Sequence, residues 1–385
     1  MTLNIHTSTE ADPVRRGREI GQRWRTEIAG TVRDYTWLFD AAGLDPATVR
    51  AVATECMDSL GQWAPDLVAE IGGVAEGAGL QSWQAAALNA RTEILVRGSI
   101  AGLKECTTAV WTPPQAPPHV LQTWDWIPSV DNFTVLRHVS AAGLRVVTFT
   151  ENGVVGKLGV NSAGLGLLFT LLCHTSDGTT RGVPVHAVAR RILDTATTVA
   201  DAVEIARTAP VTASAAITVM TWDGDRTDAA VVEVSPAGTA VLPAEDGFLL
   251  HTNHFLDPGL APGDRLAAIG DDTLPRLDAL RRRRSVLTGA GRTDWARGLI
   301  SHWADGAPIC AHPRPDAPPT DRWETKVTFS FDLTRPSLIL QQGGPCQVTP
   351  DGWQEIPARA SRSTEHRAQC AAPHAAPKRS GAGHE

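Results

Sequence analysis

Cys106 has the residue type and the surroundings of a thiol nucleophile. It follows Glu105 and precedes the hydroxyls of Thr107 and Thr108, where an alanine-rich, helix-like segment changes to alternating, strand-like sequence. A structural cysteine lies more often within an apolar run. The pattern therefore predicts that Cys106 begins a strand and that its thiol takes part in covalent chemistry.

Asp125 and Asn161 are further polar residues in strand-like sequence. Asp125 lies between Trp124 and Trp126, where a carboxylate requires partners. An aspartate in a turn at the end of a strand would explain it equally well. Asn161 lies among closely spaced glycines, a pattern that favours a tight hairpin with an Asn-Ser turn.

Two histidine-containing segments complete the set of candidates. His251 and His254 flank Asn253 at the end of a strand-like run, which suggests metal ligands as one interpretation. No third ligand is evident nearby, so the sequence predicts no metal site there. Farther along, His312 and Arg314 lie in a short, proline-rich turn, for which a plain loop is the simpler interpretation.

Taken together, these residues resemble a known family, the autoproteolytic acyltransferases and amidases typified by acyl-coenzyme A:6-aminopenicillanate (isopenicillin N) acyltransferase. This family is part of the N-terminal-nucleophile hydrolases. The resemblance covers about residues 15–345. The segments that carry it are, in chain order, 89–93, 106–108, 124–125, 151–164, 182–184 and 251–254. Each of these motifs is weak alone, and their shared order makes the resemblance specific.

The resemblance implies that the chain cuts itself between Glu105 and Cys106 and then uses Cys106 as an N-terminal nucleophile. It also implies that Asp125 holds the new α-amino group, and that Asn253 stabilises the oxyanion. Supporting residues of the site are expected to be Thr107, Trp124, His254, His312 and Arg314.

The sequence departs from the family pattern at two positions near these residues. Thr123 stands where the fungal motif has asparagine before Trp-Asp. Ala311 stands where the family places an active-site arginine, which leaves His312 or Arg314 as its substitute. Glu105 also replaces a small residue, a change that we expect to be tolerated because this side chain leaves with the first chain.

The activity implied is hydrolysis of linear amide C–N bonds, or acyl transfer to an amine, through an acyl thioester. Hydrolysis ranks slightly higher because it needs only water. The alternatives are a dedicated acyl-CoA-dependent N-acyltransferase of secondary metabolism, and a non-catalytic relative that is never processed. The expected partners are a small-molecule amide or acyl donor and an amine acceptor, with no cofactor except acyl-CoA as a donor substrate. Asn161, Leu168 and Phe169 are expected to line the acyl pocket, although core packing explains them equally well.

Composition excludes several other classes of protein. The 385 residues carry a net charge of −7 and a pI of about 5.9, which argues against a nucleic-acid partner. The longest nearly apolar run, 163–173, is too short to span a membrane, and residues 1–12 lack the pattern of a secretory signal. Six cysteines without a C-x-x-C pair predict neither a disulfide scaffold nor a zinc site. A cytoplasmic location is the resulting expectation.

The elements that would position the candidate residues alternate in blocks. Residues 13–100 are expected to be helical, with the glycine-rich stretch 71–80 ending in a turn and an exposed ion pair formed by Arg91 and Glu93. Further helices are expected from Pro184 and over 200–209, 264–285 and 293–303. Strands are expected at 107–112, 119–126, 135–139, 144–150, 154–160, 164–173, 214–221, 229–235, 239–242, 248–252, 326–332 and 337–341.

Strands that follow strands without crossover helices predict an α+β fold with two antiparallel sheets. The family resemblance implies the same arrangement, a four-layer αββα sandwich. The predicted division is a helical α chain over 1–105, a catalytic β chain over 106–345, and a disordered tail over 346–385. After cleavage, the α and β chains are expected to stay associated.

Overall fold

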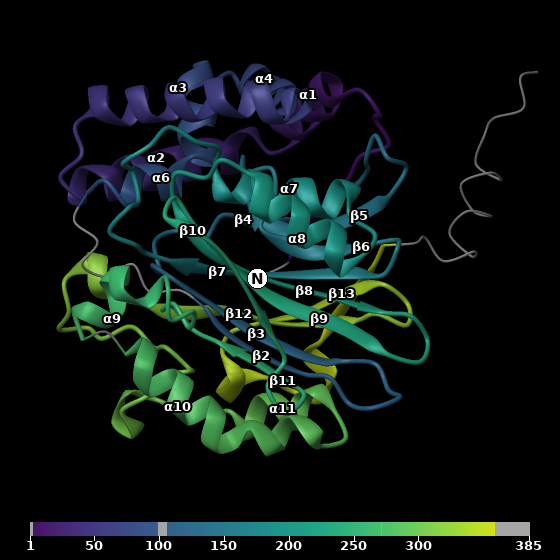
Figure 1. The fold of residues 1–385 in the computed structure, drawn as a ribbon. Helices are drawn as coiled ribbons and strands as arrows, with labels where there is room; N and C mark the ends of the chain where they lie inside the picture. The colour runs from purple at the N-terminus through teal and green to yellow at the C-terminus, as the bar shows by residue number, and fades with distance from the viewer. Residues whose placement is uncertain (1–2, 99–105, 271, 359–385) are drawn as a thin grey trace, which may run out of the picture.

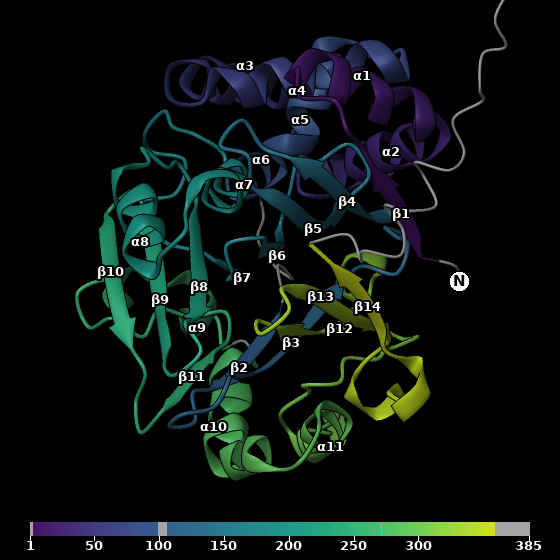
Figure 2. The same cartoon turned by 90° about the vertical axis from the view of Figure 1, so that its right-hand side faces the viewer.

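The computed structural model describes residues 3–98, 106–270 and 272–358, which form four layers of secondary structure (Figure 1). Helices from the first half of the chain cover an eight-stranded sheet. This sheet packs on a six-stranded sheet, and helices of the second half cover its outer face (Figures 1 and 2). The predicted α+β sandwich of αββα type is therefore confirmed.

The larger sheet has the strand order β1-β4-β5-β6-β7-β8-β9-β10. Its strands are β1 (Asn4–Thr7), β4 (Phe133–Val139), β5 (Arg145–Glu151), β6 (Leu158–Asn161), β7 (Leu165–Leu172), β8 (Ser214–Trp222), β9 (Thr227–Ser235) and β10 (Gly238–Pro243). All neighbours pair antiparallel except β1 and β4, which are parallel. The sequence analysis missed β1, whose four residues are too few to show a clear alternation.

The smaller sheet has the order β11-β2-β3-β12-β13-β14 and is antiparallel throughout. Its strands are β2 (Thr107–Trp111), β3 (His119–Trp126), β11 (Phe248–His251), β12 (Glu324–Asp332), β13 (Ser337–Gln342) and β14 (Gln354–Pro357). The predicted tail over 346–385 is wrong in its first part, because β14 pairs with β13 and buries Ile356. Residues 359–385 lie outside the described part of the chain.

The helices that precede β8 lie above the larger sheet in Figure 1. They are α1 (Pro13–Arg23), α2 (Arg25–Ala41), α3 (Pro46–Trp63), α4 (Pro65–Ala78), α5 (Ser82–Asn89), α6 (Arg91–Leu95), α7 (Val185–Thr195) and α8 (Val199–Thr208). Asp12 and Asp45 cap α1 and α3 through hydrogen bonds to backbone N–H groups, each followed by proline in the first turn. Among the described residues, none of the helices is long and apolar enough to cross a bilayer.

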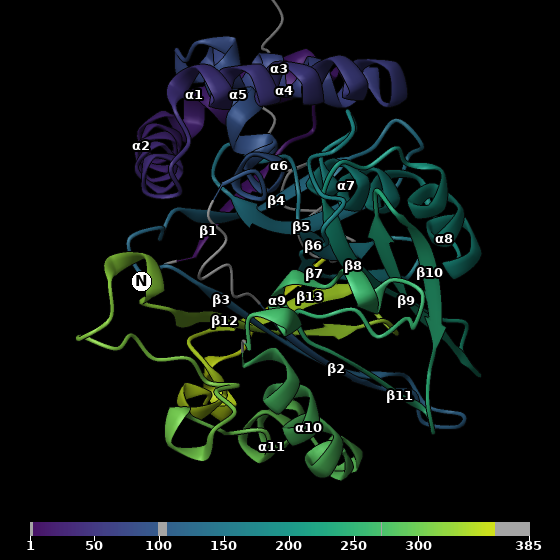
Figure 3. The same ribbon diagram turned by 60° about the vertical axis from the view of Figure 1, so that its left-hand side comes forward.

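The helices of the second half cover the smaller sheet (Figures 1 and 3). They are α9 (Arg265–Ala268), α10 (Thr273–Arg283) and α11 (Arg292–Gly298), with short 3₁₀ turns between them. The helix predicted over 264–285 is therefore divided. Arg281 and Arg284 form partly exposed ion pairs with Asp278 and Asp246, as expected of a solvated face.

The glycine-rich stretch 71–80 ends in a turn as predicted, because α4 ends at Ala78 and Gly79 has a left-handed backbone with φ of 72°, while its other glycines lie inside α4. A Cβ added to Gly73 would be 2.3 Å from Val14 O of α1, and one added to Gly17 of α1 would be 2.0 Å from Glu70 O of α4. The glycines therefore allow the two helices to pack with their backbones in contact. Packing of this kind depends on the partner helix, which explains why these glycines lie within a helix.

Polar groups join the two sheets next to the start of β2. Gln122 Nε2 donates to Thr108 Oγ1 (3.0 Å), to Phe169 O (2.8 Å) and to Thr170 Oγ1 (3.3 Å). Thr108 and Gln122 belong to the smaller sheet, whereas Phe169 and Thr170 lie in β7 of the larger sheet. These bonds fix which face of β2 points between the sheets.

Candidate active site

Cys106 immediately precedes β2 and is fully buried. Its backbone has φ of 57°, in the left-handed region that L-residues other than Asn, Asp and His seldom occupy. A non-glycine residue in this region carries about 1–3 kcal/mol of strain, and such strain clusters at functional sites. Glu105, on the other side of the predicted cleavage site, lies outside the described residues.

Asp125 lies on β3, beside the end of β2 where Cys106 is found. The two strands pair Thr107 with Thr123, and Thr107 N also donates to Thr123 Oγ1 (3.2 Å). Asp125 is two residues beyond Thr123 on the same face of β3, and it is buried. The structure thus brings Asp125 and the start of β2 together, while Thr123 supports the backbone next to Cys106.

Asn253 follows β11, the strand that pairs with β2 on its other side. Its Nδ2 donates to Leu171 O of β7 (2.9 Å), and its backbone N donates to Thr273 Oγ1 (2.8 Å). The side chain is buried. An amide nitrogen carries two hydrogens, so the bond to Leu171 leaves a second N–H for another acceptor.

Arg276 of α10 connects these residues, and the sequence analysis missed it. Its Nη1 donates to Cys106 O and to Thr107 Oγ1 (both 3.0 Å), and its Nη2 donates to Asn253 Oδ1 (2.8 Å). Its Nε forms an ion pair with Asp272 (2.8 Å). One buried guanidinium therefore fixes the backbone at Cys106 and sets the orientation of the Asn253 amide.

His254 supports this arrangement from the far side of Asn253. Its Nδ1 is 2.9 Å from Thr273 Oγ1, the same hydroxyl that accepts the bond from Asn253 N. Burial, and then the nearby His251 and Arg276, lower the pKa of His254 to about 4. His254 is therefore neutral near pH 7 and acts as a structural partner of Thr273.

His251 also has a structural explanation. Its Nε2 lies 2.8 Å from Glu233 Oε1 of β9, and its Nδ1 lies 2.5 Å from Thr252 O. Both ring nitrogens are thus engaged, and the pair with Glu233 ties β11 to the larger sheet. This explains the histidine without a metal ion.

His312 and Arg314, the expected substitutes for the arginine absent at Ala311, make their described contacts elsewhere. His312 contacts Cys346 and His302, and Arg314 lies over the ring of Trp303. The arginine that contacts Cys106 is Arg276. It lies 35 positions earlier in the chain than Ala311.

Trp124 and the predicted pocket residues are part of the core. Trp124 is fully buried, with Lys157 Nζ 4.4 Å from its ring centre. Asn161 binds four backbone groups, Ala163 N and Leu165 N in its hairpin and Leu193 O and Ala196 O at the end of α7. Phe169 packs on His186 of α7, on the face of β7 away from the second sheet, whereas Leu168 faces between the sheets. The pocket prediction is therefore not supported for Asn161 and Phe169.

The predicted exposed ion pair of Arg91 and Glu93 is wrong, because both side chains are buried and have other partners. Arg91 pairs with Glu151, whose other oxygen accepts from Tyr35. Glu93 Oε1 accepts from Val185 N at the start of α7 (2.8 Å). Burial, opposed chiefly by this bond, raises the pKa of Glu93 to about 7.

We predict that Glu93→Gln makes the free energy of unfolding less dependent on pH. Because the folded-state pKa of Glu93 lies above its unfolded value of 4.5, its contribution to stability is present below pH 4.5 and is lost as the pH rises through 7. The loss is about 3 kcal/mol. Urea unfolding at pH 5 and pH 8 should show this loss in the unmodified chain and not in Glu93→Gln, and parallel pH profiles would refute the prediction.

Comparison with known proteins identifies a related family. The family described as acyl-coenzyme A:6-aminopenicillanic acid acyl-transferase matches residues 111–286, a range that includes Asp125, Asn253 and Arg276 and begins after Cys106. The acyl-coenzyme A:6-aminopenicillanic-acid-acyltransferase 40 kDa form of Emericella nidulans is 28% identical over 256 residues. The alignment covers 66% of this chain and 70% of that protein. The resemblance expected from the sequence is thus confirmed.

Solved structures with distant similarity include two acylases. Penicillin V acylase from Agrobacterium tumefaciens has a TM-score of 0.43 and 16% identity, covering 64% of this chain and 86% of its own. The Caenorhabditis elegans ortholog of N-acylethanolamine-hydrolyzing acid amidase has a TM-score of 0.41 and 13% identity, covering 66% of this chain and 100% of its own. Both likenesses are too distant to bear on the fold or on the reaction.

Proposed function

We propose that this relative of the acyl-coenzyme A:6-aminopenicillanic acid acyl-transferase family is a self-processing enzyme that uses Cys106 as an N-terminal nucleophile. The chain would be cut before Cys106, and the new N-terminus would then hydrolyse amide bonds or transfer acyl groups through a thioester. The observation that carries this proposal is the strained backbone of Cys106, held by the same guanidinium that orients Asn253.

Self-processing begins with attack of the Cys106 thiol on the carbonyl carbon of Glu105. The peptide C–N bond breaks as the C–S bond forms, and the proton of the thiol passes to the departing amine of Cys106. Water then hydrolyses the thioester and releases the α-carboxylate of Glu105 and the free thiol of Cys106. Rupture of this bond frees Cys106 from its left-handed conformation, so the backbone strain favours the reaction.

The released α-amino group then serves as the general base for the second reaction. Its reference pKa of about 7.7–8.0 is close to neutral pH, which suits it to accept the thiol proton directly or through one water. The buried carboxylate of Asp125, beside the start of β2, is suited to hold this amino group in place. No histidine base is then required.

Asn253 is suited to stabilise the oxyanion that forms when the thiolate attacks a substrate carbonyl. Arg276 donates to Asn253 Oδ1, so the Nδ2 hydrogens are presented on the other side of the amide. Leu171 O takes one of them, and the second is available to the oxyanion. A preorganised donor of this kind lowers the barrier because it needs no reorientation during the reaction.

The two chains produced by cleavage would stay together. β1 contributes a strand to the larger sheet, and the helices before Cys106 are bound to it by buried hydrogen bonds. Asn89 Nδ2 donates to Gly153 O (2.9 Å), and Asn89 Oδ1 accepts from Val155 N (3.0 Å). Separation would exchange these bonds for bonds to water, so each favours association by about 0.5–1.5 kcal/mol.

The expected substrates are a small-molecule amide or acyl donor and, for transfer, an amine acceptor. The absence of the family's arginine at Ala311 favours the alternative of a relative that is never processed. Arg276 weakens that alternative because it places a guanidinium in contact with Cys106. Hydrolysis and transfer are distinguished by incubating processed protein with a series of N-acyl amides and acyl-CoA thioesters, with and without an amine. Release of acid without an amine supports hydrolysis, and product formation that requires the amine supports transfer. Failure of every donor to acylate the thiol would refute the proposal.

A further inference from the structure

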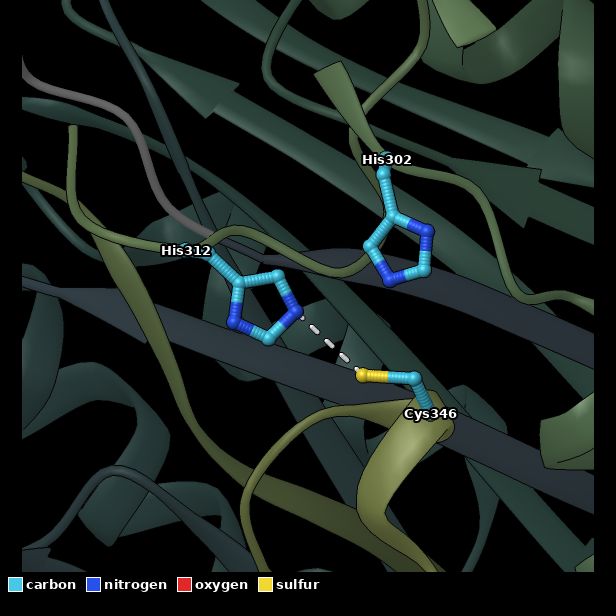
Figure 4. A group of neighbouring side chains, drawn as sticks. All are labelled: His302, His312 and Cys346. Carbon is cyan, nitrogen blue, oxygen red and sulfur yellow. Dashed lines mark hydrogen bonds between the residues drawn. The ribbon is translucent and has the colours of Figure 1, made fainter. Parts of the chain in front are cut away.

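His302, His312 and Cys346 form a cluster of metal-binding side chains away from the candidate active site (Figure 4). One ligand atom of each lies within 4.8 Å of the other two. His312 Nε2 and Cys346 Sγ are 3.3 Å apart, and Figure 4 shows a ring nitrogen of His302 turned toward them. The three residues come from separate segments, so the cluster exists because of the fold.

The backbone around the cluster is held by its own hydrogen bonds. Cys310 N donates to Ser301 O (2.8 Å), which joins the two segments that carry the histidines. Cys346 lies in the 3₁₀ turn Pro345–Gln347, between β13 and β14. The side chains are therefore presented by a formed framework, which lowers the entropic cost of binding an ion.

His302 also has a carboxylate partner on the ring nitrogen that faces away from the cluster. Its Nδ1 lies 4.0 Å from Asp305 Oδ2, and its backbone N donates to the same oxygen (2.8 Å). The Nε2 is then the atom turned toward the other two side chains (Figure 4). At 4.0 Å this contact is longer than a hydrogen bond, so Asp305 acts on the ring through its charge and favours a cation beside it.

The distances suit a small ion with four ligands. Tetrahedral zinc, with bonds of about 2.0–2.3 Å, places its ligand atoms about 3.3–3.8 Å apart. The separation of His312 Nε2 and Cys346 Sγ already has this length. Cys310, whose side chain is buried, lies two residues before His312 in the same segment and offers a further thiol, although its sulfur is not among the three ligand atoms within 4.8 Å of one another.

We propose that His302, His312 and Cys346 bind one Zn²⁺ ion, and that the thiol of Cys310 turns toward the ion as the fourth ligand. Imidazole and thiolate are the ligands that zinc prefers, and a site filled by four protein ligands is structural. The sequence predicted no zinc site because these residues form no C-x-x-C pair. The ligands come from segments that meet through the fold.

The ion would fasten the chain next to the candidate active site. Ala311 lies between two of the proposed ligands, and it exchanges hydrogen bonds with Thr325 of β12. Thr325 is paired with Asp125 across β12 and β3. Zinc would thus stabilise the paired ends of β12 and β3 beside Asp125 without taking part in the reaction.

The proposal is tested by titrating the full-length, metal-free protein with Co²⁺ in reducing buffer, where a disulfide between Cys310 and Cys346 cannot compete. One equivalent of Co²⁺ should give the strong visible bands of a tetrahedral ion and a thiolate-to-cobalt charge-transfer band, and Zn²⁺ should displace it. His302→Ala, His312→Ala and Cys346→Ser should each lower the affinity more than about 100-fold, since each removes a direct ligand. Asp305→Asn should lower it less than any of these three changes, because Asp305 does not bind the ion.

Matched variants test whether the signal belongs to this cluster. Cys56→Ser removes a buried cysteine of α3, Cys370→Ser removes one outside the described residues, and Cys106→Ala removes the proposed nucleophile; all three should retain the cobalt spectrum. Zn²⁺ should also raise the melting temperature of the unmodified chain and leave that of His312→Ala unchanged. Absence of the spectrum, or its persistence in His312→Ala and Cys346→Ser, would overturn the proposal. A weaker signal in Cys310→Ser would support its assignment as the fourth ligand.

Discussion

A Cys106→Ala variant is expected to remain a single chain of 385 residues and to show no acyl-transfer or amidase activity. The unmodified protein is expected to be cut into two chains, residues 1–105 and 106–385. Alanine has no nucleophile to attack the carbonyl of Glu105, so neither the acyl shift nor the later acyl-enzyme can form. Mass spectrometry of the denatured proteins measures the first effect, and release of acid from an N-acyl amide measures the second.

A Cys106→Ser variant serves as the matched control. Serine keeps the size of the side chain and offers a weaker nucleophile at neutral pH, so we expect slow self-cleavage and a large loss of turnover. The fold should be retained in both variants, because the contacts of Arg276 with Cys106 O and Thr107 do not involve the thiol. Cleavage of Cys106→Ala at the same bond, or an unmodified chain that stays whole for days, would contradict the proposed role.

The architecture was predictable because the strands carry strong local signals. Alternation of residue types and the proline-rich turn between β2 and β3 identified both strands, and successive hairpins indicated antiparallel sheets. Local signals failed where a partner decides the structure. β14 forms because β13 offers an unpaired edge.

The candidate site was predictable to the extent that its residues occur in distinctive local sequence. Cys106 lies where helix-like sequence changes to strand-like sequence. Asp125 lies between tryptophans, and Asn253 lies between histidines. Arg276 has no such signal, because several arginines follow it on the same helix. Which of them points inward depends on how α10 crosses the sheet. The grouping of His302, His312 and Cys346 was missed for the same reason, since three separate segments bring these residues together.

An Asn253→Ala variant is expected to turn over about 100–1,000-fold more slowly per processed chain, with KM little changed. The amide N–H would contact the oxyanion, which exists only along the reaction path, so its loss acts on kcat. Steady-state kinetics on processed protein measures this. Asn253→Asp, which keeps the shape and loses the donor, should show a similar loss, and full activity in that variant would exclude the oxyanion role.

The contribution of Arg276 can be separated from that of Asn253 by a double-mutant cycle. Arg276→Lys keeps the charge and loses the fork that spans Cys106 O and Asn253 Oδ1, so it should lower kcat by releasing the amide. In the Asn253→Ala background, the same change should have little further effect on kcat, because the group that it orients is already gone. Additive effects would mean that Arg276 acts on the reaction by another route. If Arg276→Lys also cleaves itself more slowly, in either background, then Arg276 has a second role in fixing the backbone of Cys106.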